Sequence, residues 1–125
     1  MKIKNVRISV RGLREMGRDF AETMERVKRG EHVAPRRELS FETVDTLRKV
    51  ITKRRLELLH MIAKKQPESV YELAHLVDRD LKSVNTDLKE LVRLGLVDLE
   101  RSEEARKKVK PIVTYDTLNI EIEVS

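Results

Sequence analysis

The chain has 125 residues, enough for one domain with a buried core or for one domain with an appended arm. Its 27 lysines and arginines against 22 aspartates and glutamates give a formal charge of +5, which favours a polyanionic partner. There is no cysteine, which excludes disulfides, thiolate metal ligands and thiol nucleophiles. No apolar run approaches about 20 residues and the first ten residues lack a signal-peptide core, so we expect a cytoplasmic protein without a membrane span.

The first third of the chain is predicted to form a strand and then a helix. Val6, Ile8 and Val10 alternate with polar residues, among them Ser9, as in a half-buried strand. Apolar residues then recur at spacings of three and four, which indicates a helix that ends near residue 30. This helix either packs on its own chain or pairs with a second subunit. The candidate dimerisation residues are therefore Leu13, Met16, Phe20, Met24 and Val27.

An extended segment and two helices are predicted next. Arg36 to Phe41 should be extended, and Phe41 to Ile51 should form a short helix. Thr52 can cap a further helix from Lys53 to about Lys65. The first turn of that helix (53–55) carries cations, which are repelled by the positive end of the helix dipole. A nearby phosphate would offset this repulsion. The apolar stripe expected to face the core is Leu56, Leu59, Ile62 and Ala63.

The segment 69–100 has the periodicity of two short helices joined by a tight turn. Ser69 and Glu72 have the capping-box spacing, in which the hydroxyl accepts a backbone N–H and the carboxylate reaches back to the cap. Asp80 is a good N-cap for the second helix, and Gly95 suits the positive φ wanted just past its end. The apolar stripe predicted for this second helix is Leu81, Val84, Leu88, Leu91 and Val92.

The polar face of the second helix carries short hydrogen-bonding groups and long cations. Asparagine can bond adenine edges, lysine can reach guanine, and small hydroxyls fit against either base or phosphate. An ordinary solvated helix face is also polar and charged, so this helix taken alone fits both interpretations. The candidates for base contacts in double-stranded DNA are Lys82, Ser83, Asn85, Thr86 and Lys89.

A charged hairpin is predicted directly after this helix. Leu96 to Leu99 should form one strand, and an extended pattern resumes at Val109 after a polar tip. A hairpin in this position is the wing of a winged helix, whose cations lie beside the phosphate backbone; a solvated loop is the alternative. The candidate phosphate contacts, including a tyrosine in the first turn of the preceding helix, are Tyr71, Arg101, Arg106, Lys107 and Lys108.

The two ends of the chain are complementary. Leu118, Ile120, Ile122 and Val124 alternate with polar and acidic residues, whereas the polar positions of the N-terminal strand are basic. Opposite charges on neighbouring strands stabilise pairing. We therefore predict that the terminal strands pair, within one subunit or across a dimer; the alternative is that each is an edge guarded by its charges.

Catalytic chemistry finds little support in the sequence. The three histidines are scattered, and no Ser/His/carboxylate set or glycine-rich phosphate loop is present. His75 and Asp78 could offer two metal ligands on one helix, but a complete site needs more. We predict no catalytic residue, no metal and no cofactor.

The segments PESVYELA and LKELVRLGLV, with a P-x-V-x-Y-D signature after the hairpin (Pro111, Val113, Tyr115, Asp116), carry a resemblance. They are similar to the winged helix-turn-helix family of prokaryotic transcriptional regulators grouped near the MarR and ArsR regulators. The resemblance covers roughly residues 30–124. Members of that family often occur beside small toxin genes, which would imply an antitoxin that binds a small toxin protein and regulates its own operon.

Together these observations predict an α+β protein, with an N-terminal strand-helix arm at 1–40 and a winged helix at 41–125 that ends in a strand after the wing. The expected function is sequence-specific binding of double-stranded DNA as a transcriptional regulator, in the form of a homodimeric repressor on two half-sites. Two alternatives stay open, namely an antitoxin and a winged-helix protein-interaction module that never contacts DNA.

Overall fold

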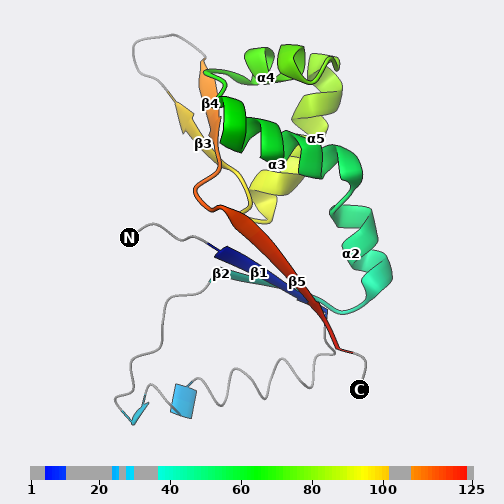
Figure 1. The fold of residues 1–125 in the computed structure, drawn as a ribbon, viewed down its shortest axis with the longest axis vertical. Helices are drawn as coiled ribbons and strands as arrows, with labels where there is room; N and C mark the ends of the chain where they lie inside the picture. Colours follow the sequence, from blue (N-terminus) through cyan, green and yellow to red (C-terminus); the bar gives the residue numbers. More distant parts are fainter. Residues whose placement is uncertain (1–4, 11–23, 26–27, 30–36, 102–107, 124–125) are drawn as a thin grey trace. The chain divides into compact units, whose positions relative to one another are not determined.

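The computed structural model describes residues 5–10, 24–25, 28–29, 37–101 and 108–123. In these ranges the chain forms four helices and five strands, which confirms the α+β class (Figure 1). The elements in chain order are β1 (Asn5–Val10), β2 (Arg37–Phe41), α2 (Val44–Val50), α3 (Lys53–Lys65), α4 (Val70–Leu76), α5 (Leu81–Arg93), β3 (Asp98–Arg101), β4 (Val109–Ile112) and β5 (Thr117–Ile122).

The chain divides into two units. The first combines Met1–Lys49 with Tyr115–Ser125, and the second is Val50–Thr114. In sequence, the second unit is therefore an insertion between α2 and β5. This division differs from the predicted boundary between residues 40 and 41, because β5 pairs with β1 and does not extend the β3–β4 hairpin.

The first unit is built on a three-stranded parallel sheet in the order β2-β1-β5. Ile8 in the central strand lies opposite Leu39 on one side and Ile120 on the other. Arg7 forms an ion pair with Glu121 across the β1–β5 boundary. The predicted pairing of the terminal strands is thus confirmed within one chain, and opposite charges accompany it.

The central strand is more buried than its alternating pattern suggests. Val6 and Ile8 are fully buried, as expected, but Ser9 is also fully buried. The Ser9 hydroxyl donates to Glu38 Oε1 at 3.2 Å and lies 3.0 Å from the Ser40 hydroxyl. Burial of a hydroxyl that keeps its hydrogen bonds costs little free energy, so β1 can be covered on both faces. The predicted exposure of Ser9 is therefore wrong.

The second unit begins with α3, whose predicted bounds are confirmed. Thr52 Oγ1 accepts the Arg55 N–H at 3.2 Å, and the helix ends at Gln66 in the left-handed region (φ 47°). The buried residues are Leu58, Leu59 and Ile62. Two of the predicted core positions are wrong: Leu56 is 42% exposed and Ala63 is also exposed. The core stripe is rotated toward residue 58, which puts position 55 on the same face.

The end of α5 explains why the next strand starts late. Gly95 has φ 76°; its N–H donates to Val92 O at 2.9 Å, and the Leu96 N–H donates to Leu91 O at 2.9 Å. These are the two bonds of a Schellman motif, with Leu91 and Leu96 as its buried apolar pair. Residues 96 and 97 therefore complete the helix end, and β3 begins at Asp98 instead of the predicted Leu96.

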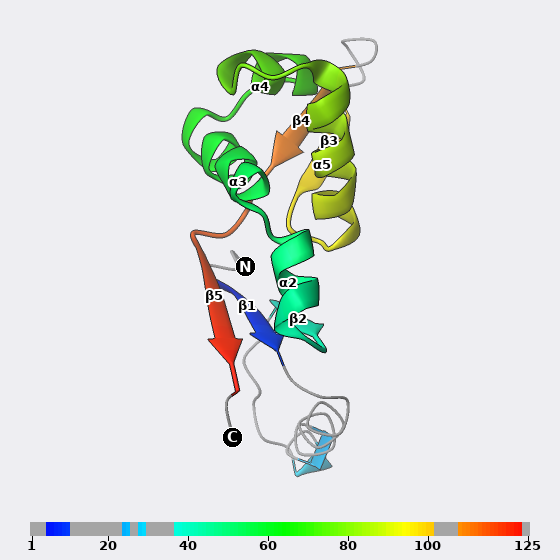
Figure 2. The same cartoon turned by 90° about the vertical axis from the view of Figure 1, so that its right-hand side faces the viewer.

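The predicted hairpin is present as the antiparallel pair β3–β4, with Leu99 opposite Pro111. Strand β4 contacts both α3 and α4, and the hairpin lies alongside the three helices (Figure 2). Its tip, 102–107, lies outside the described residues. So does most of the predicted helix over 13–27, of which Met24 is described as helical and 42% exposed.

Candidate nucleic-acid interface

The start of α4 is fixed by its cap. Ser69 Oγ accepts the Glu72 N–H at 3.0 Å, as predicted. The Glu72 carboxylate accepts from the Glu68 N–H at 3.0 Å, one residue before the expected cap N–H. The carboxylate of the capping box therefore accepts from the N–H of residue 68 instead of residue 69. Both bonds still hold the start of the helix.

The turn between α4 and α5 is specified residue by residue. Asp78 adopts the left-handed conformation (φ 54°), and its N–H donates to His75 O at 3.2 Å. The Arg79 N–H donates to Ala74 O at 3.0 Å, which completes a second Schellman motif. Asp80 then caps α5, because its Oδ2 accepts the Ser83 N–H at 2.9 Å. The orientation of α5 thus depends on local hydrogen bonds at both ends of the turn.

Asp87 joins α5 to two other elements. Its Oδ1 accepts from Arg55 Nε of α3 at 3.0 Å, and its Oδ2 accepts from Arg79 Nη2 of the turn at 2.7 Å. The same Nη2 donates to Ser83 Oγ at 2.8 Å, and Arg55 Nη1 donates to Val50 O at 2.8 Å. The side chain of Asp87 is only 16% exposed. We call the set Arg55, Arg79, Ser83 and Asp87 the Asp87 cluster.

The Asp87 cluster is held by charge in a partly buried setting. Burial alone would raise the pKa of Asp87, but the hydrogen bonds and positive charges of Arg79 and Arg55 outweigh it and hold the pKa below its ordinary value. Arg79 Nε and Nη1 are buried with no hydrogen-bond partner among the described residues. Since Arg55 bonds Asp87 and Val50 O, its guanidinium is engaged within the protein, and a phosphate beside the first turn of α3 stays a prediction for Lys53 and Arg54.

The opposite side of α5 is open. Lys82, Asn85, Thr86 and Lys89 are exposed there, whereas Ser83, a base-contact candidate that belongs to the Asp87 cluster, is half-buried. Ser83 Oγ accepts from Arg79, and Thr86 Oγ1 donates to Lys82 O at 3.0 Å, so both hydroxyls are engaged within the protein. Lys82, Asn85 and Lys89 have side-chain polar groups without a hydrogen bond or ion pair in the part of the chain that is described. These three are the base-contact candidates whose polar ends are available.

A groove of about 600 Å³ lies between the start of α4, α5 and the hairpin. It brings together five of the predicted contact residues from separate elements, namely Tyr71, Asn85, Lys89, Arg101 and Lys108. Lys82, Ser83 and Thr86 do not line it. Its floor and walls are mainly apolar and include Val70, Leu81, Leu88, Val92, Leu99 and Val109.

Two apolar residues of this groove, Leu81 and Leu99, are unusually exposed. Leu81 was predicted in the core stripe of α5, but it is 43% exposed, because it sits in the first turn where the helix leaves the core. Leu99 of β3 is 46% exposed. The groove therefore offers apolar surface between its cationic side chains.

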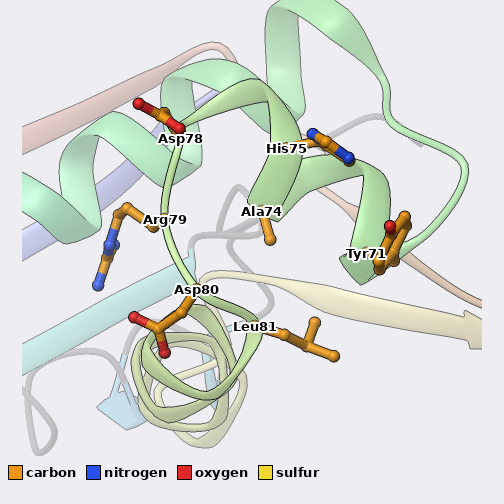
Figure 3. A pocket seen from close by; sticks show the side chains of 7 residues that line it. All are labelled: Tyr71, Ala74, His75, Asp78, Arg79, Asp80 and Leu81. Atoms are coloured by element: carbon orange, nitrogen blue, oxygen red, sulfur yellow. The ribbon is translucent and has the colours of Figure 1, made fainter.

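A smaller hollow of about 320 Å³ lies over the α4–α5 turn. Figure 3 shows the Asp78, Arg79 and Asp80 side chains on one side of it and those of Tyr71 and Leu81 on the other. Tyr71 is 64% exposed, and its ring meets the His75 ring edge to face, with centroids 5.4 Å apart. Tyr71 thus links the hollow to the groove, with its hydroxyl at the surface where a phosphate contact was predicted.

The Asp87 cluster was not predicted from the sequence, although the sequence contains one indication of it. Arg55 falls on the same stripe of α3 as Leu58, Leu59 and Ile62, and a charge on an apolar stripe calls for a buried counter-charge. Arg79 lies in the turn between α4 and α5, where the sequence pattern gives no sign of its contact with Asp87. The two remaining phosphate candidates, Arg106 and Lys107, lie outside the described residues, whereas Lys108 is described and exposed.

The described residues contain neither a metal-binding cluster nor a helix suited to span a membrane. No group of three or more histidine, aspartate or glutamate side chains is placed to hold a metal ion within those ranges. Among the helices described, none has the length and apolar character that a membrane span requires.

Comparison with known proteins gives one family. Residues 50–120, which comprise the whole second unit and the start of β5, match the family model described as HVO_A0114. No curated protein matches the chain.

Proposed function

The chain belongs to the HVO_A0114 family, and we propose that it is a winged-helix protein that binds double-stranded DNA sequence-specifically and represses transcription. The observation that carries this proposal is the gathering of Tyr71, Asn85, Lys89, Arg101 and Lys108 from α4, α5 and the hairpin around one groove. The proposal assigns binding, without catalysis, to this surface.

In the proposed complex α5 lies in the major groove. Asn85 and Lys82 bond base edges from the exposed side of the helix, with Lys89 one turn further along. Since these side chains have no internal partner among the described residues, no existing interaction has to break before they bind. The Asp87 cluster on the other side fixes the helix against α3, which limits the entropy lost on binding.

The hairpin supplies the affinity that does not depend on sequence. Arg101 and Lys108 flank the described ends of its tip, and Tyr71 is exposed on α4 at the same groove. Contacts of such groups with phosphates position a protein on the duplex and release counterions. We therefore expect affinity that falls steeply with salt.

The test is the salt dependence of binding to a labelled duplex, followed by fluorescence anisotropy. Arg101→Ala combined with Lys108→Ala should lower the slope of log affinity against log salt by about one unit per lost phosphate contact, on all duplexes alike. The matched control is Lys64→Ala combined with Lys65→Ala, which removes the same charge from exposed positions on α3 away from the groove and should leave the slope within about 0.3 units.

Two results would contradict the proposal. Equal slope changes in both double variants would mean that net charge, and not the groove, attracts the duplex. A wild-type protein without salt-dependent affinity for any duplex from a random pool would indicate a protein-interaction module instead.

A further inference from the structure

The outer edge of β5 has no strand neighbour among the described residues. On its other side β5 pairs with β1. An edge strand presents unpaired N–H and C=O groups, and proteins usually blunt it with charged side chains, proline or a bulge. The six residues of β5 contain neither proline nor lysine, and the β1–β5 register runs through them without a break. Their one charged residue, Glu121, forms an ion pair with Arg7 of β1 in the same sheet.

One face of β5 is also apolar and uncovered. Ile120 is 49% exposed and Ile122 is 46% exposed, although Ile8 and Val10, their partners on β1, are buried. The opposite edge strand differs, because Phe41 of β2 is only 8% exposed. The apolar side chain at the end of β2 is therefore covered, whereas those of Ile120 and Ile122 on β5 are half-exposed.

From these observations we infer that β5 pairs antiparallel with β5 of a second copy of this chain, about a two-fold axis through Ile120. The two sheets then join into one sheet of six strands, with Ile120 opposite the partner's Ile120 and Leu118 opposite the partner's Ile122. Closed two-fold pairing of identical edges uses the same patch on both subunits. The observations that support this pairing do not depend on the proposed DNA binding.

Charge selects this register over its neighbours. With the axis at position 120, Glu121 faces the partner's Asn119 and Glu123 faces the partner's Thr117, so no carboxylate lies opposite another. Moving the axis to position 121 would put Glu121 directly opposite its own copy, which is destabilising. Moving it to position 119 would leave Ile122 opposite the partner's Asp116. Of these three axes, only the one at position 120 matches apolar with apolar at every even position from 118 to 122 without placing one carboxylate opposite another.

The register can be tested by cross-linking, because the chain has no cysteine of its own. Directly opposite residues of an antiparallel pair have Cα atoms about 4.5–5.5 Å apart, within the range that a disulfide spans. Ile120→Cys should therefore form a covalent dimer under diamide oxidation. Asn119→Cys is the matched control, because two residues at position 119 would be separated by about 8 Å and should link at least about tenfold more slowly.

A charge-swap pair tests the same axis without oxidation. Ile120→Lys and Ile120→Glu each place like charges at the axis and should be monomeric by light scattering at concentrations where the wild type is dimeric, with dimer dissociation constants raised by about tenfold or more. Mixed together, the two variants should form a heterodimer visible by native mass spectrometry. Circular dichroism confirms that each variant is folded, since position 120 is half-exposed.

Three outcomes would overturn the inference. The first is a wild-type protein that stays monomeric at about 100 µM, far above the dissociation constants of stable dimers. The second is a wild-type dimer that Ile120→Lys leaves intact. That result would place the dimer interface elsewhere, for example on the predicted helix over 13–27. The third is equal cross-linking of the 119 and 120 variants. None of these outcomes bears on DNA binding, which is measured separately.

Discussion

The two polar sides of α5 differ in what they contact. On one side Ser83 and Asp87 are held by Arg55 and Arg79, and the Asp87 side chain is 16% exposed. On the other side Lys82, Asn85 and Lys89 are exposed without an internal partner among the described residues. One helix thus carries polar residues that fix its position and polar residues left for another molecule. Residue type alone does not separate these roles, because both sides look hydrophilic.

A change on the side of α5 that carries Ser83 and Asp87, here called the fixed side, should have the largest effect on stability. Asp87→Ala leaves two partly buried guanidinium groups without their carboxylate, so the free energy of unfolding should fall by about 3 kcal/mol, measured by urea denaturation. Glu90→Ala is the matched control, since it removes a carboxylate from the same helix that pairs with Arg93 at the surface, and no measurable change is expected. A loss in the control as large as in Asp87→Ala would show that the Asp87 cluster has no special role.

Changes on the open side should alter DNA binding and leave stability intact. Asn85→Ala and Lys82→Ala should each cost about 1–3 kcal/mol of binding on the preferred site and less on random duplex, measured by competition binding. The urea midpoint of both variants should equal that of the wild type. Val84→Asp is the control for unfolding, because it places an unpaired carboxylate in a fully buried position. Equal losses on both kinds of duplex would show that α5 touches only the DNA backbone.

Acid should weaken the fixed side selectively. The pKa of Asp87 is lower in the folded protein than its ordinary value of 3.8, so its contribution to stability is complete above that value and is lost as pH falls through the folded pKa. Asp87→Asn cannot titrate. The stability difference between wild type and Asp87→Asn should therefore be constant at neutral pH and shrink below about pH 4. Urea denaturation at several pH values measures it, and a difference independent of pH would contradict the assignment.

The smallest effect is expected in the turn that leads into α5. Asp78 has φ 54°, a conformation that glycine adopts without penalty, so Asp78→Gly should raise the free energy of unfolding by about 0.5 kcal/mol. Asp116→Gly is the control, because its φ is not positive, and the added freedom of the unfolded chain should destabilise the protein. Thermal unfolding of both variants gives the comparison, and destabilisation by both would argue against the left-handed conformation at position 78.

The sequence predicted local structure better than contacts between elements. The caps at Thr52, Ser69 and Asp80 and the helix end at Gly95 are confirmed, because each depends on hydrogen bonds between residues a few positions apart. The Asp87 cluster was missed, because its bonds join α3, the turn and α5. The exposure of Leu56 was also missed, since residues of one type on both sides of a helix do not reveal which side meets the core.

The candidate DNA-contact residues show the same difference between local structure and contacts between elements. Periodicity placed Lys82, Asn85 and Lys89 on a polar face, which the structure bears out as exposed. Periodicity could not show that Tyr71, Arg101 and Lys108 would meet Asn85 and Lys89 at one groove, because that depends on how the hairpin packs against the helices. Their roles as DNA contacts stay predictions.

The place of β5 in the sheet has a consequence for the order in which the protein is made. Residue 8 pairs with residue 120, so β1 leaves the ribosome long before its second neighbour exists. At about 5–20 residues per second, synthesis of Val50–Thr114 alone takes roughly 3–13 seconds. During that interval the helical insert can fold on its own local contacts, while β1 keeps an open edge. On a polysome, β5 of one chain can therefore reach β1 of a neighbouring chain before its own, so rapid expression should favour strand-exchanged oligomers over subunits in which β1 pairs with its own β5.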